Sequence, residues 1–282
     1  MARIASSRSI PPHQLNALEA RMQAYYAAVP DYPAFHSPSQ HPLEWRQVLA
    51  ELRKRKASQS PLAILEFGAG RSGFPTWLRH QLASAGARAS VAITCQDVTA
   101  ANRTHLLQVA DAVVISPLQE GVLPQSSFDI IFSTHCFEHV ARPEQLLHTL
   151  TGLLKPGGSL LLFAPRYDLP LYLSPSAGDL SIPQRLLLSL RLLAIRLISR
   201  LRGTPAFVLD TKPACLDRPF RRDADAIHWV SSHDLHLFAR HHRLAITELN
   251  VSQHAPALSK QWLIDQFCKL AIVLHKPESP QS

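Results

Sequence analysis

Three glycines with the spacing G-x-G-x-x-G follow a short apolar stretch of the chain. The stretch covers residues 63–67, and its only charged residue is Glu66, a composition typical of a buried strand in a parallel sheet. Residues 74–82, after Gly73, have helical spacing. A strand, a glycine turn and a helix bring backbone N–H groups and a helix N-terminus close to a polar ligand, and a Cβ atom in the turn would block that approach. Dinucleotide sites have the same spacing, and a tight turn that binds nothing is the plainest alternative.

A carboxylate ends the next apolar run. Residues 90–97 have the composition of a second strand, and Asp97 is its last residue. A carboxylate at that point accepts hydrogen bonds from both hydroxyls of a ribose, which indicates an adenosine-containing ligand. Several nucleotide cofactors share this feature, so Asp97 does not choose among them. A surface aspartate that caps a helix over residues 99–110 is the alternative.

Imidazole side chains follow the strand that we predict at residues 128–132. Ligands of a doubly wound sheet sit at the carboxyl ends of its strands, so we expect residues 133–139 to face a cofactor and an acceptor. His135 and His139 titrate near neutral pH and are the candidate catalytic bases, with His228 as a third. Glu138 precedes His139, and either a direct role at the site or a purely structural role is open for it.

Four motifs occur in a fixed order along the chain. They are Glu66 with the glycine turn, S-F-D at 127–129, F-E-H-V at 137–140 and L-K-P-G-G at 154–158. With these motifs the chain resembles the class I methyltransferases that use S-adenosylmethionine, and most closely the branch that includes the quinone and small-molecule methyltransferases. The resemblance covers residues 62–167, and more loosely 225–276. The motifs are specific for the superfamily and say little about the acceptor.

The resemblance also implies which residues bind S-adenosylmethionine. One acid is missing, because residues 116–118 stand where family members commonly carry a carboxylate near the adenine, unless Asp111 or Glu120 replaces it. Leu118 still offers a backbone N–H and an apolar face. The cofactor contacts that the resemblance implies are Glu66, Gly68, Ala69, Gly70, Gly73, Asp97, Leu118 and Ser133.

One cluster in the sequence resembles a metal site, but we do not expect it to bind a metal. His135, Glu138 and His139 form an H-x-x-E-H cluster. Some quinone and RNA methyltransferases use the similar pattern E-x-x-E-H to hold a divalent cation, and a His/Glu/His set suits one chemically. Here His135 replaces the first acid and no further ligand is visible in the sequence, so we assign no metal.

The elements that position these residues predict an α/β fold. We expect a Rossmann-like doubly wound sheet, mostly parallel with an antiparallel last strand. An N-terminal helical cap covers residues 1–60, and the first twelve residues have no predicted order. The S-adenosylmethionine-binding core covers 61–166, a helical insertion 167–222, and a C-terminal completion of the sheet 223–282.

The insertion contains an amphipathic helix over residues 184–202. It is too rich in arginine to cross a membrane, but a basic amphipathic helix lies well on an anionic membrane surface. A lid or dimer helix whose leucines pack on the domain is the alternative. Its apolar face carries Leu186, Leu187, Leu190, Leu193, Leu197, Ile198 and Leu201, and the opposite face carries Arg185, Ser189, Arg196 and Arg200.

Charge and cysteines limit the compartment and the partners. The 282-residue chain has a net charge of +8, which suits an anionic partner, and no secretion signal is visible at its N-terminus. The four cysteines lack C-x-x-C spacing, and we expect them to be reduced thiols of a cytoplasmic protein. If the amphipathic helix meets lipid, we expect the protein to be peripheral to a membrane. No nucleic acid is expected, because aromatic residues do not interleave the basic run. The cysteines are Cys95, Cys136, Cys215 and Cys268.

The sequence therefore predicts a methyltransferase that moves a methyl group from S-adenosylmethionine to a small-molecule or lipid-like acceptor, on oxygen. Two alternatives stay open. An NAD-dependent oxidoreductase is supported only by the glycine spacing. A non-catalytic protein of the same fold, binding a membrane or a partner, is supported by the missing acid near Ser116.

Overall fold

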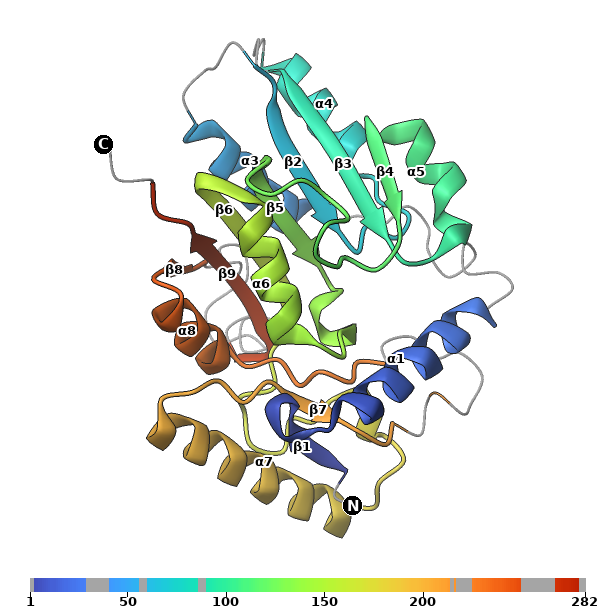
Figure 1. The fold of residues 1–282 in the computed structure, drawn as a ribbon, viewed down its shortest axis with the longest axis vertical. Coiled ribbons are helices and arrows are strands. Elements are labelled where there is room, and N and C mark those ends of the chain that lie inside the picture. Colours follow the sequence, from blue (N-terminus) through green and yellow to red (C-terminus); the bar gives the residue numbers. More distant parts are fainter. Residues whose placement is uncertain are drawn as a thin grey trace.

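A seven-stranded sheet forms the centre of the protein, in the strand order β4-β3-β2-β5-β6-β9-β8 (Figure 1). The computed structural model describes residues 3–28, 41–55, 60–85, 90–213, 216, 225–249 and 267–278. Cys215 lies outside these residues. The strands of the sheet are β2 Leu62–Phe67, β3 Val91–Asp97, β4 Ala112–Ile115, β5 Phe128–Thr134, β6 Leu154–Pro165, β8 Ala245–Glu248 and β9 Lys269–His275.

The strand directions confirm the predicted fold class. β2 pairs in parallel with both β3 and β5, and β6 extends the parallel set. β9, the last strand in the sequence, is antiparallel to β6 and to β8. Since the parallel strands share one direction, their carboxyl ends gather at one edge of the sheet, where Phe67 lies opposite Ser133.

Helices cover both faces of the sheet and close two apolar layers. α6 and α8 contribute to the layer that contains Leu65 of β2, and α3, α4 and α5 contribute to the layer that contains Ile64. Neighbouring residues of a strand point to opposite faces, so one strand supplies both layers. The covering helices are α3 Pro42–Arg53, α4 Phe74–Ser84, α5 Arg103–Val109 (after the 3-10 turn η2 Ala100–Asn102), α6 Pro143–Leu153 and α8 Ser232–His241.

The expectation that the first twelve residues lack order is wrong from residue 3 onward. Strand β1, Ile4–Ser6, pairs antiparallel with β7, Val208–Asp210, which lies in the insertion. Ile4 is fully buried, and Arg3 forms ion pairs with Asp179 and Asp210. The turn η1 Ser7–Ser9 and helix α1 Pro12–Ala27 follow. The short strand was not predictable because its partner is some two hundred residues away.

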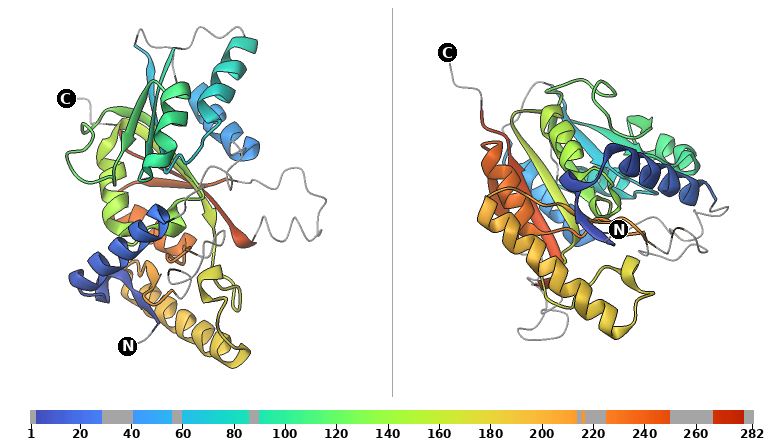
Figure 2. Two further views of the ribbon diagram at one scale, coloured as in Figure 1. Left: turned by 90° about the vertical axis from the view of Figure 1, so that its right-hand side faces the viewer. Right: turned by 60° about the horizontal axis from the view of Figure 1, so that its bottom comes forward.

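The long helix α7, Ile182–Arg202, runs along one end of the molecule (Figures 1 and 2). Ser181 and Gln184 form a capping box at its start, and Gly203, with φ of 63°, ends it. The residues that it buries are Leu188, Ser189, Leu192, Arg196 and Ser199, and the apolar face predicted from the sequence is exposed. The leucines of that face therefore do not pack on the domain, contrary to the lid alternative.

Two further 3-10 turns complete the fold. η3, Phe137–His139, follows β5, and η4, Pro175–Ala177, lies between β6 and α7. None of the helices in the described ranges is long and apolar enough to span a bilayer.

Candidate functional site

The glycine turn after β2 directs its first backbone N–H groups into the protein. Gly68 N donates to Gln96 Oε1 at 3.2 Å, and Ala69 N donates to the Gln96 carbonyl at 2.8 Å. Gly70 N donates to Asp97 Oδ2 at 2.7 Å. The expectation that the N–H groups of the turn face a ligand is therefore wrong for these three. A dinucleotide site needs such donors for its diphosphate, so the turn does not favour one.

Gly68 and Gly70 both require the backbone freedom of glycine, for different reasons. Gly68 has φ of +66°, and a Cβ atom there would lie 2.1 Å from Cys136 Sγ. Gly70 has φ of +57°, but a Cβ atom there would have no heavy atom of the described residues within 4 Å. Gly68 thus allows the turn to touch the chain after β5, whereas Gly70 borders open space large enough for a ligand atom.

Glu66 organises the turn from beneath. The residue is 4% exposed, and its carboxyl accepts hydrogen bonds from Ser72 Oγ at 2.8 Å and from Cys95 Sγ at 3.6 Å. Ser72 Oγ in turn accepts from Phe74 N at the start of α4. Burial raises the pKa of Glu66 to about 8, against the opposing effect of these hydrogen bonds. Glu66 therefore joins the turn to the first residue of α4, and Gly73 is the N-cap of that helix.

Asp97 lies beside the turn at the carboxyl end of β3. It is 7% exposed, and besides the bond from Gly70, its Oδ1 accepts from Thr99 N at 2.7 Å. Burial raises the pKa of Asp97, and the hydrogen bonds from Thr99 and Gly70 oppose that shift. A carboxylate offers about four lone-pair sites. The two backbone hydrogen bonds use one site on each oxygen, and the side chains of Thr99 and Asn102 also favour the charged form of Asp97.

Ser133 and Leu118 lie on neighbouring parts of the same edge. Ser133 is fully buried, and within the described part of the chain its Oγ has no hydrogen-bond partner. Leu118 packs against the same apolar layer as Cys136. The loop before Leu118 is held by Gln96, whose Nε2 donates to the Ser116 carbonyl at 2.6 Å.

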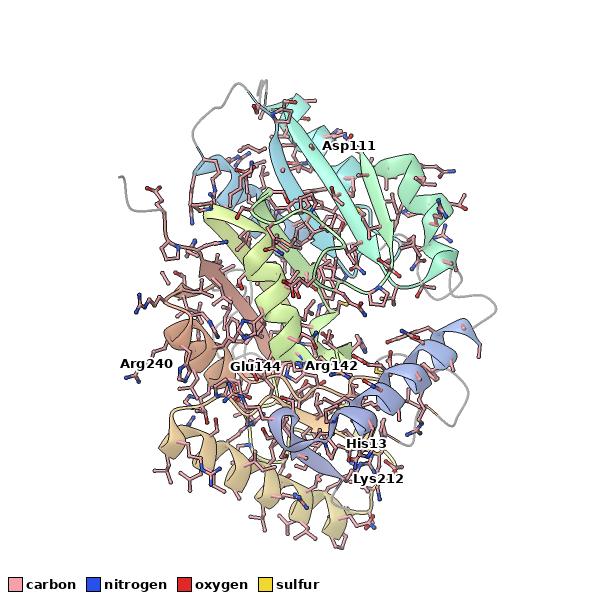
Figure 3. All side chains as sticks on the ribbon, in the orientation of Figure 1. His13, Asp111, Arg142, Glu144, Lys212 and Arg240 are labelled. Atoms are coloured by element: carbon pink, nitrogen blue, oxygen red, sulfur yellow. The ribbon has the colours of Figure 1, made fainter. Side chains whose placement is uncertain are left out.

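Neither Asp111 nor Glu120 lies where it could replace the acid that is missing near the expected adenine position. Asp111 precedes β4, at the opposite end of the sheet (Figure 3), where it accepts from Arg79 at 2.8 Å and from Ile93 N at 2.7 Å. Glu120 is exposed. Adenine contacts are thus left to the loop that contains Leu118.

The residues around the turn fit S-adenosylmethionine. Asp97 places a carboxylate beside the turn, where ribose hydroxyls could reach it, and among the described residues nothing fills the space above Gly70 and nothing pairs with the buried Ser133 Oγ. The three inward N–H groups leave no cradle for a diphosphate, and S-adenosylmethionine carries no phosphate.

His139 forms a buried ion pair that the sequence did not suggest. Its Nδ1 lies 3.2 Å from Asp225 Oδ2, and Tyr26 of α1 donates a hydrogen bond from its hydroxyl to the same oxygen. Burial lowers the pKa of His139, but the Asp225 carboxylate outweighs this effect and raises it to about 10. The pKa of Asp225 is lowered, because His139 and Tyr26 outweigh its burial. At neutral pH His139 is therefore an imidazolium and not a free base.

Glu138 lies between the two candidate histidines. Its Oε1 is 3.7 Å from His135 Nδ1 and 3.9 Å from His139 Nε2, and the residue is 2% exposed. His228 is fully buried behind it, with Nδ1 3.0 Å from the Phe137 carbonyl. Burial lowers the pKa of His228 to about 4, so this side chain is a neutral interior residue and not the third base that the sequence suggested.

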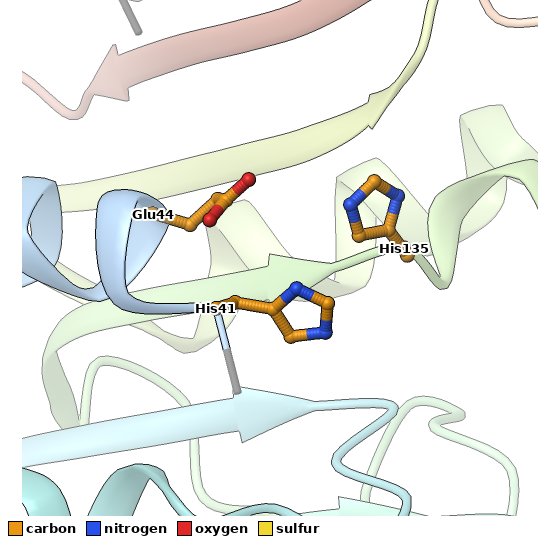
Figure 4. A group of neighbouring side chains, drawn as sticks. All are labelled: His41, Glu44 and His135. Carbon is orange, nitrogen blue, oxygen red and sulfur yellow. The ribbon is translucent and has the colours of Figure 1, made fainter. Parts of the chain in front are cut away.

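His135 lies apart from His139, at the exposed end of β5. It has φ of +52°, and its backbone N–H donates to the Phe163 carbonyl at 2.8 Å. Its imidazole lies beside His41 and Glu44, which come from the start of α3 (Figure 4). Both histidines thus approach Glu138 Oε1, at 3.7 and 3.9 Å, but His135 also groups with His41 and Glu44, whereas His139 pairs with Asp225.

Sequence reasoning missed Gln96, Asp225, His41 and Glu44 as members of the site. Gln96 precedes the predicted ribose-binding Asp97, and its position next to that acid was the one available signal. The other three lie far from the glycine motif and belong to no local pattern.

The family of the chain follows from a match to a family model. The model, described as a methyltransferase domain, matches residues 39–240, more than half of the 282-residue chain. The chain belongs to this methyltransferase domain family. Membership confirms the predicted class I, S-adenosylmethionine-dependent methyltransferase and supports S-adenosylmethionine as its cofactor. It does not confirm the quinone and small-molecule branch.

Solved structures agree with this family in fold. The plantazolicin methyltransferase BpumL, in complex with a pentazolic desmethylPZN analog and SAH, is 13% identical with a TM-score of 0.51, covering 95% of this chain and 100% of its own. An S-adenosylmethionine-dependent methyltransferase from Mesorhizobium loti is 16% identical with a TM-score of 0.50, covering 83% and 98%. The chain spans 52% of the CMeT domain chain of the citrinin polyketide synthase, at 19% identity and a TM-score of 0.48. No curated protein matches the chain.

Proposed function

We propose that the protein transfers a methyl group from S-adenosylmethionine to an oxygen atom of a small-molecule or lipid-like acceptor. The observation that carries the proposal is the contact between Gly70 and Asp97 beside open space. The backbone of the turn fixes one oxygen of Asp97 at 2.7 Å, so the carboxylate is preorganised before a ribose arrives. A dinucleotide oxidoreductase lacks comparable support, because the N–H groups of the turn are already used.

Each residue of the turn has a defined place in this proposal. S-adenosylmethionine, when bound, supplies an electrophilic methyl carbon on a sulfonium. Asp97 would bind the ribose hydroxyls, and Leu118 would cover the adenine with its apolar side chain. Ser133 would donate its hydroxyl proton to a polar atom of the cofactor. The remaining contacts, from the turn itself and its supports, would come from Glu66, Gly68, Ala69, Gly70 and Gly73.

The two histidines would act differently toward the acceptor. His139 carries a proton at neutral pH, so we assign it to donate a hydrogen bond to an acceptor oxygen and to hold that oxygen near the methyl carbon. His135 has a side chain that is 38% exposed, which leaves it accessible to a bound acceptor. It is therefore the candidate to accept a proton from an acceptor hydroxyl. A carboxylate acceptor would need no base.

Calorimetric titration tests the cofactor proposal directly. We expect saturable binding of S-adenosylmethionine by the full chain and no binding of NAD. Asp97→Ala should weaken S-adenosylmethionine binding at least about tenfold, because it removes charge-assisted hydrogen bonds worth about 1.5 kcal/mol or more. Glu120→Ala, an exposed acid on the following loop, is the matched control and should bind as the parent does. Binding of NAD alone, or of neither, contradicts the proposal.

A second proposal concerns the surface on which the enzyme works: we propose that α7 rests on an anionic lipid surface. The apolar face of the helix is turned outward, with Leu187 69% exposed, Leu190 56%, Leu197 58% and Leu201 79%. Its inward face buries Arg196, which donates a hydrogen bond to the Tyr167 carbonyl and lies 3.5 Å from Asp168. Contiguous exposed apolar faces of this size mark interaction surfaces.

The charges beside that face favour lipid over a neutral partner. Arg191 and Arg202 flank the leucines, and the chain as a whole has a net charge of +8. Basic side chains next to a helix that lies in the interface attract anionic headgroups, each contributing about 1 kcal/mol near the surface. An enzyme held there would meet lipid-like acceptors, which agrees with the acceptor class proposed above.

Vesicle flotation tests the surface proposal. We expect the full chain to bind vesicles of equal phosphatidylglycerol and phosphatidylcholine, and to be released by salt. The double variant Leu187→Glu/Leu190→Glu should lose at least about tenfold in binding, since each buried leucine contributes about 1.5 kcal/mol or more. Leu107→Glu, 59% exposed on α5, is the control and should bind normally. Sedimentation velocity tests the alternative that a second copy of the chain binds this face. A stable dimer in solution that the double variant abolishes would overturn the proposal that the face binds lipid.

A further inference from the structure

Three metal-binding side chains from separate parts of the chain face a common space. His41 precedes α3, Glu44 lies in the first turn of that helix, and His135 follows β5 (Figure 4). One ligand atom from each residue lies within 4.8 Å of the other two. The rings of His41 and His135 have their centroids 5.2 Å apart.

Glu44 is the member of this group that most needs a cation. The residue is 9% exposed, and within the described part of the chain its carboxylate has no hydrogen bond and no ion pair. A buried carboxylate without a partner is costly, so buried charges in proteins are normally paired or coordinate metals. Lys269 lines the same hollow as Glu44, so an ion bound here would have to compete with its ammonium group.

His135 reaches the group through an unusual backbone conformation. Its φ of +52° is rare for a residue other than glycine. The hydrogen bond from its N–H to the Phe163 carbonyl holds this conformation at the end of β5. Backbone conformations of this kind are strained and concentrate at functional sites. Here the conformation places the imidazole beside α3 and away from the strand.

We propose that His41, Glu44 and His135 bind one divalent transition-metal ion of the zinc class. Two imidazoles and one carboxylate form the ligand set of catalytic zinc sites, which keep a position open for water or substrate. Bonds of about 2.1 Å in a tetrahedral arrangement separate ligand atoms by about 3.4 Å. The observed limit of 4.8 Å is about 1.4 Å wider, a difference that side-chain rotations close.

The position of the site suggests its use, and this part rests on the proposed function. The hollow that Glu44 and His135 line also includes Phe163 and Ala164 near the carboxyl end of β6, the same edge of the sheet as the predicted methyl-transfer site. An oxygen of the acceptor would occupy the open position on the ion, and with the ion bound the activation of an acceptor hydroxyl would come from the ion and not from His135 acting as a base. This ligand set is not the local H-x-x-E-H cluster, because His139 is paired with Asp225 and the ligand atoms that lie within 4.8 Å of one another are those of His41, Glu44 and His135.

Metal titration of the full chain, made metal-free with a chelator, tests the site. Zinc binding by calorimetry should show one ion per chain, and cobalt(II) should give the absorption of a low-coordinate ion with nitrogen ligands. His41→Ala and Glu44→Gln should each weaken zinc binding by more than about 100-fold, beyond the usual range for residues that only support a ligand. Zinc should raise the melting temperature of the parent and not that of either variant.

Two controls separate this site from its rivals. His80→Ala, an exposed histidine on α4, should bind zinc as the parent does. Glu138→Gln should also retain zinc. If Glu138→Gln loses zinc binding and Glu44→Gln keeps it, the ion belongs to the H-x-x-E-H cluster and the proposal is overturned. Absence of stoichiometric zinc binding by the parent overturns it as well. Circular dichroism checks the fold of each variant, and His41→Ala, a partly exposed residue before α3, carries the test if Glu44→Gln does not fold.

Titration with S-adenosylmethionine in the absence of metal keeps the two proposals apart. Zinc binding without cofactor binding would refute the proposed methyl transfer and leave the metal site standing. Cofactor binding without zinc binding would do the reverse.

Discussion

Nδ1 of His139 and Oδ2 of Asp225 lie 3.2 Å apart, although the two residues belong to distant parts of the chain. Tyr26 donates its hydroxyl proton to the same oxygen, so helix α1 is joined to the loop after β5 through one carboxylate. The candidate catalytic histidine is thereby fixed in its charged form by residues outside the sheet.

This ion pair predicts a specific dependence of stability on pH. The pKa of His139 is raised from 6.5 to about 10 in the folded chain, so its contribution is complete below pH 6.5 and is lost as the pH rises through about 10. Asp225→Asn should therefore reduce the free energy of unfolding at pH 7 by about 1.5–3 kcal/mol, and the difference from the parent should vanish above pH 10. Urea unfolding across this range measures it.

A more exposed pair supplies the control for that experiment. Glu19 lies 2.9 Å from Arg142, and both side chains are partly exposed. Glu19→Gln should cost no more than about 1 kcal/mol at any pH in the range. A difference between Asp225→Asn and the parent that persists unchanged at pH 11 would contradict the assignment of an imidazolium.

Alanine at the two left-handed glycines should separate steric from conformational effects. Gly68→Ala combines an unfavourable φ with a contact of 2.1 Å to Cys136 Sγ, whereas in the part of the chain that the structure describes Gly70→Ala meets no atom within 4 Å. We expect Gly70→Ala to lower stability by about 1–2 kcal/mol. Gly68→Ala should cost clearly more, and thermal unfolding gives the comparison. Equal losses would show that the turn yields at Cys136.

Gly70→Ala should have a second effect, on ligand binding. Its methyl group would enter the space that we assign to the cofactor, so affinity for S-adenosylmethionine should fall while the protein stays folded. Calorimetry on the folded variant checks this, and unchanged affinity would place the cofactor elsewhere.

Glu66 predicts a fall in stability with rising pH, as His139 does, but in a lower pH window. Its pKa rises from 4.5 to about 8 on folding, so the folded chain binds more protons than the unfolded chain between these values. Stability should therefore fall as the pH rises through this window. Glu66→Gln keeps an acceptor for Ser72 but carries no charge, so at pH 9 it should be more stable than the parent by more than about 1 kcal/mol. Parallel stability profiles for the two proteins would refute a strained carboxylate at this position.

Asp168 lies at the edge of the sheet where ligands bind, but its hydrogen bonds are those of a helix cap. It follows β6 at the carboxyl edge of the sheet, but its carboxylate accepts from Ser231 Oγ at 2.6 Å and from Ser232 N at 3.0 Å, at the start of α8. Asp168→Ala should cost about 3–5 kcal/mol, because it removes this helix cap and also the carboxylate beside the buried Arg196, and it should leave S-adenosylmethionine affinity unchanged. A large loss of affinity with intact stability would instead make it a binding residue.

The core of the fold was predictable because local patterns dominate it. Buried parallel strands such as β2 are continuous apolar runs. Few sequences without glycine can form the turn that follows β2. The two faces of α7 were also predictable from periodicity. Which face turns inward was not, because the hydrogen bond from Arg196 to the Tyr167 carbonyl is a tertiary contact.

The rest of the candidate site required the folded chain. His41 and His135 are ordinary histidines in the sequence, and only the packing of α3 beside the end of β5 brings them together. The same holds for Asp225, which lies in no motif. Contacts between residues so far apart leave no periodicity or spacing to read.

The pairing of β1 with β7 fixes the order in which this protein is completed during synthesis. Arg3 and Asp210 are 207 positions apart, so β1 leaves the ribosome long before its partner exists. At about 5–20 residues per second, the N-terminal segment waits for tens of seconds. Most of the core sheet and the glycine turn are already available in that interval, whereas α1 still awaits Asp225, the carboxylate bound by its Tyr26. A nascent chain therefore lacks the carboxylate that joins α1 to His139 until residue 225 has been synthesised.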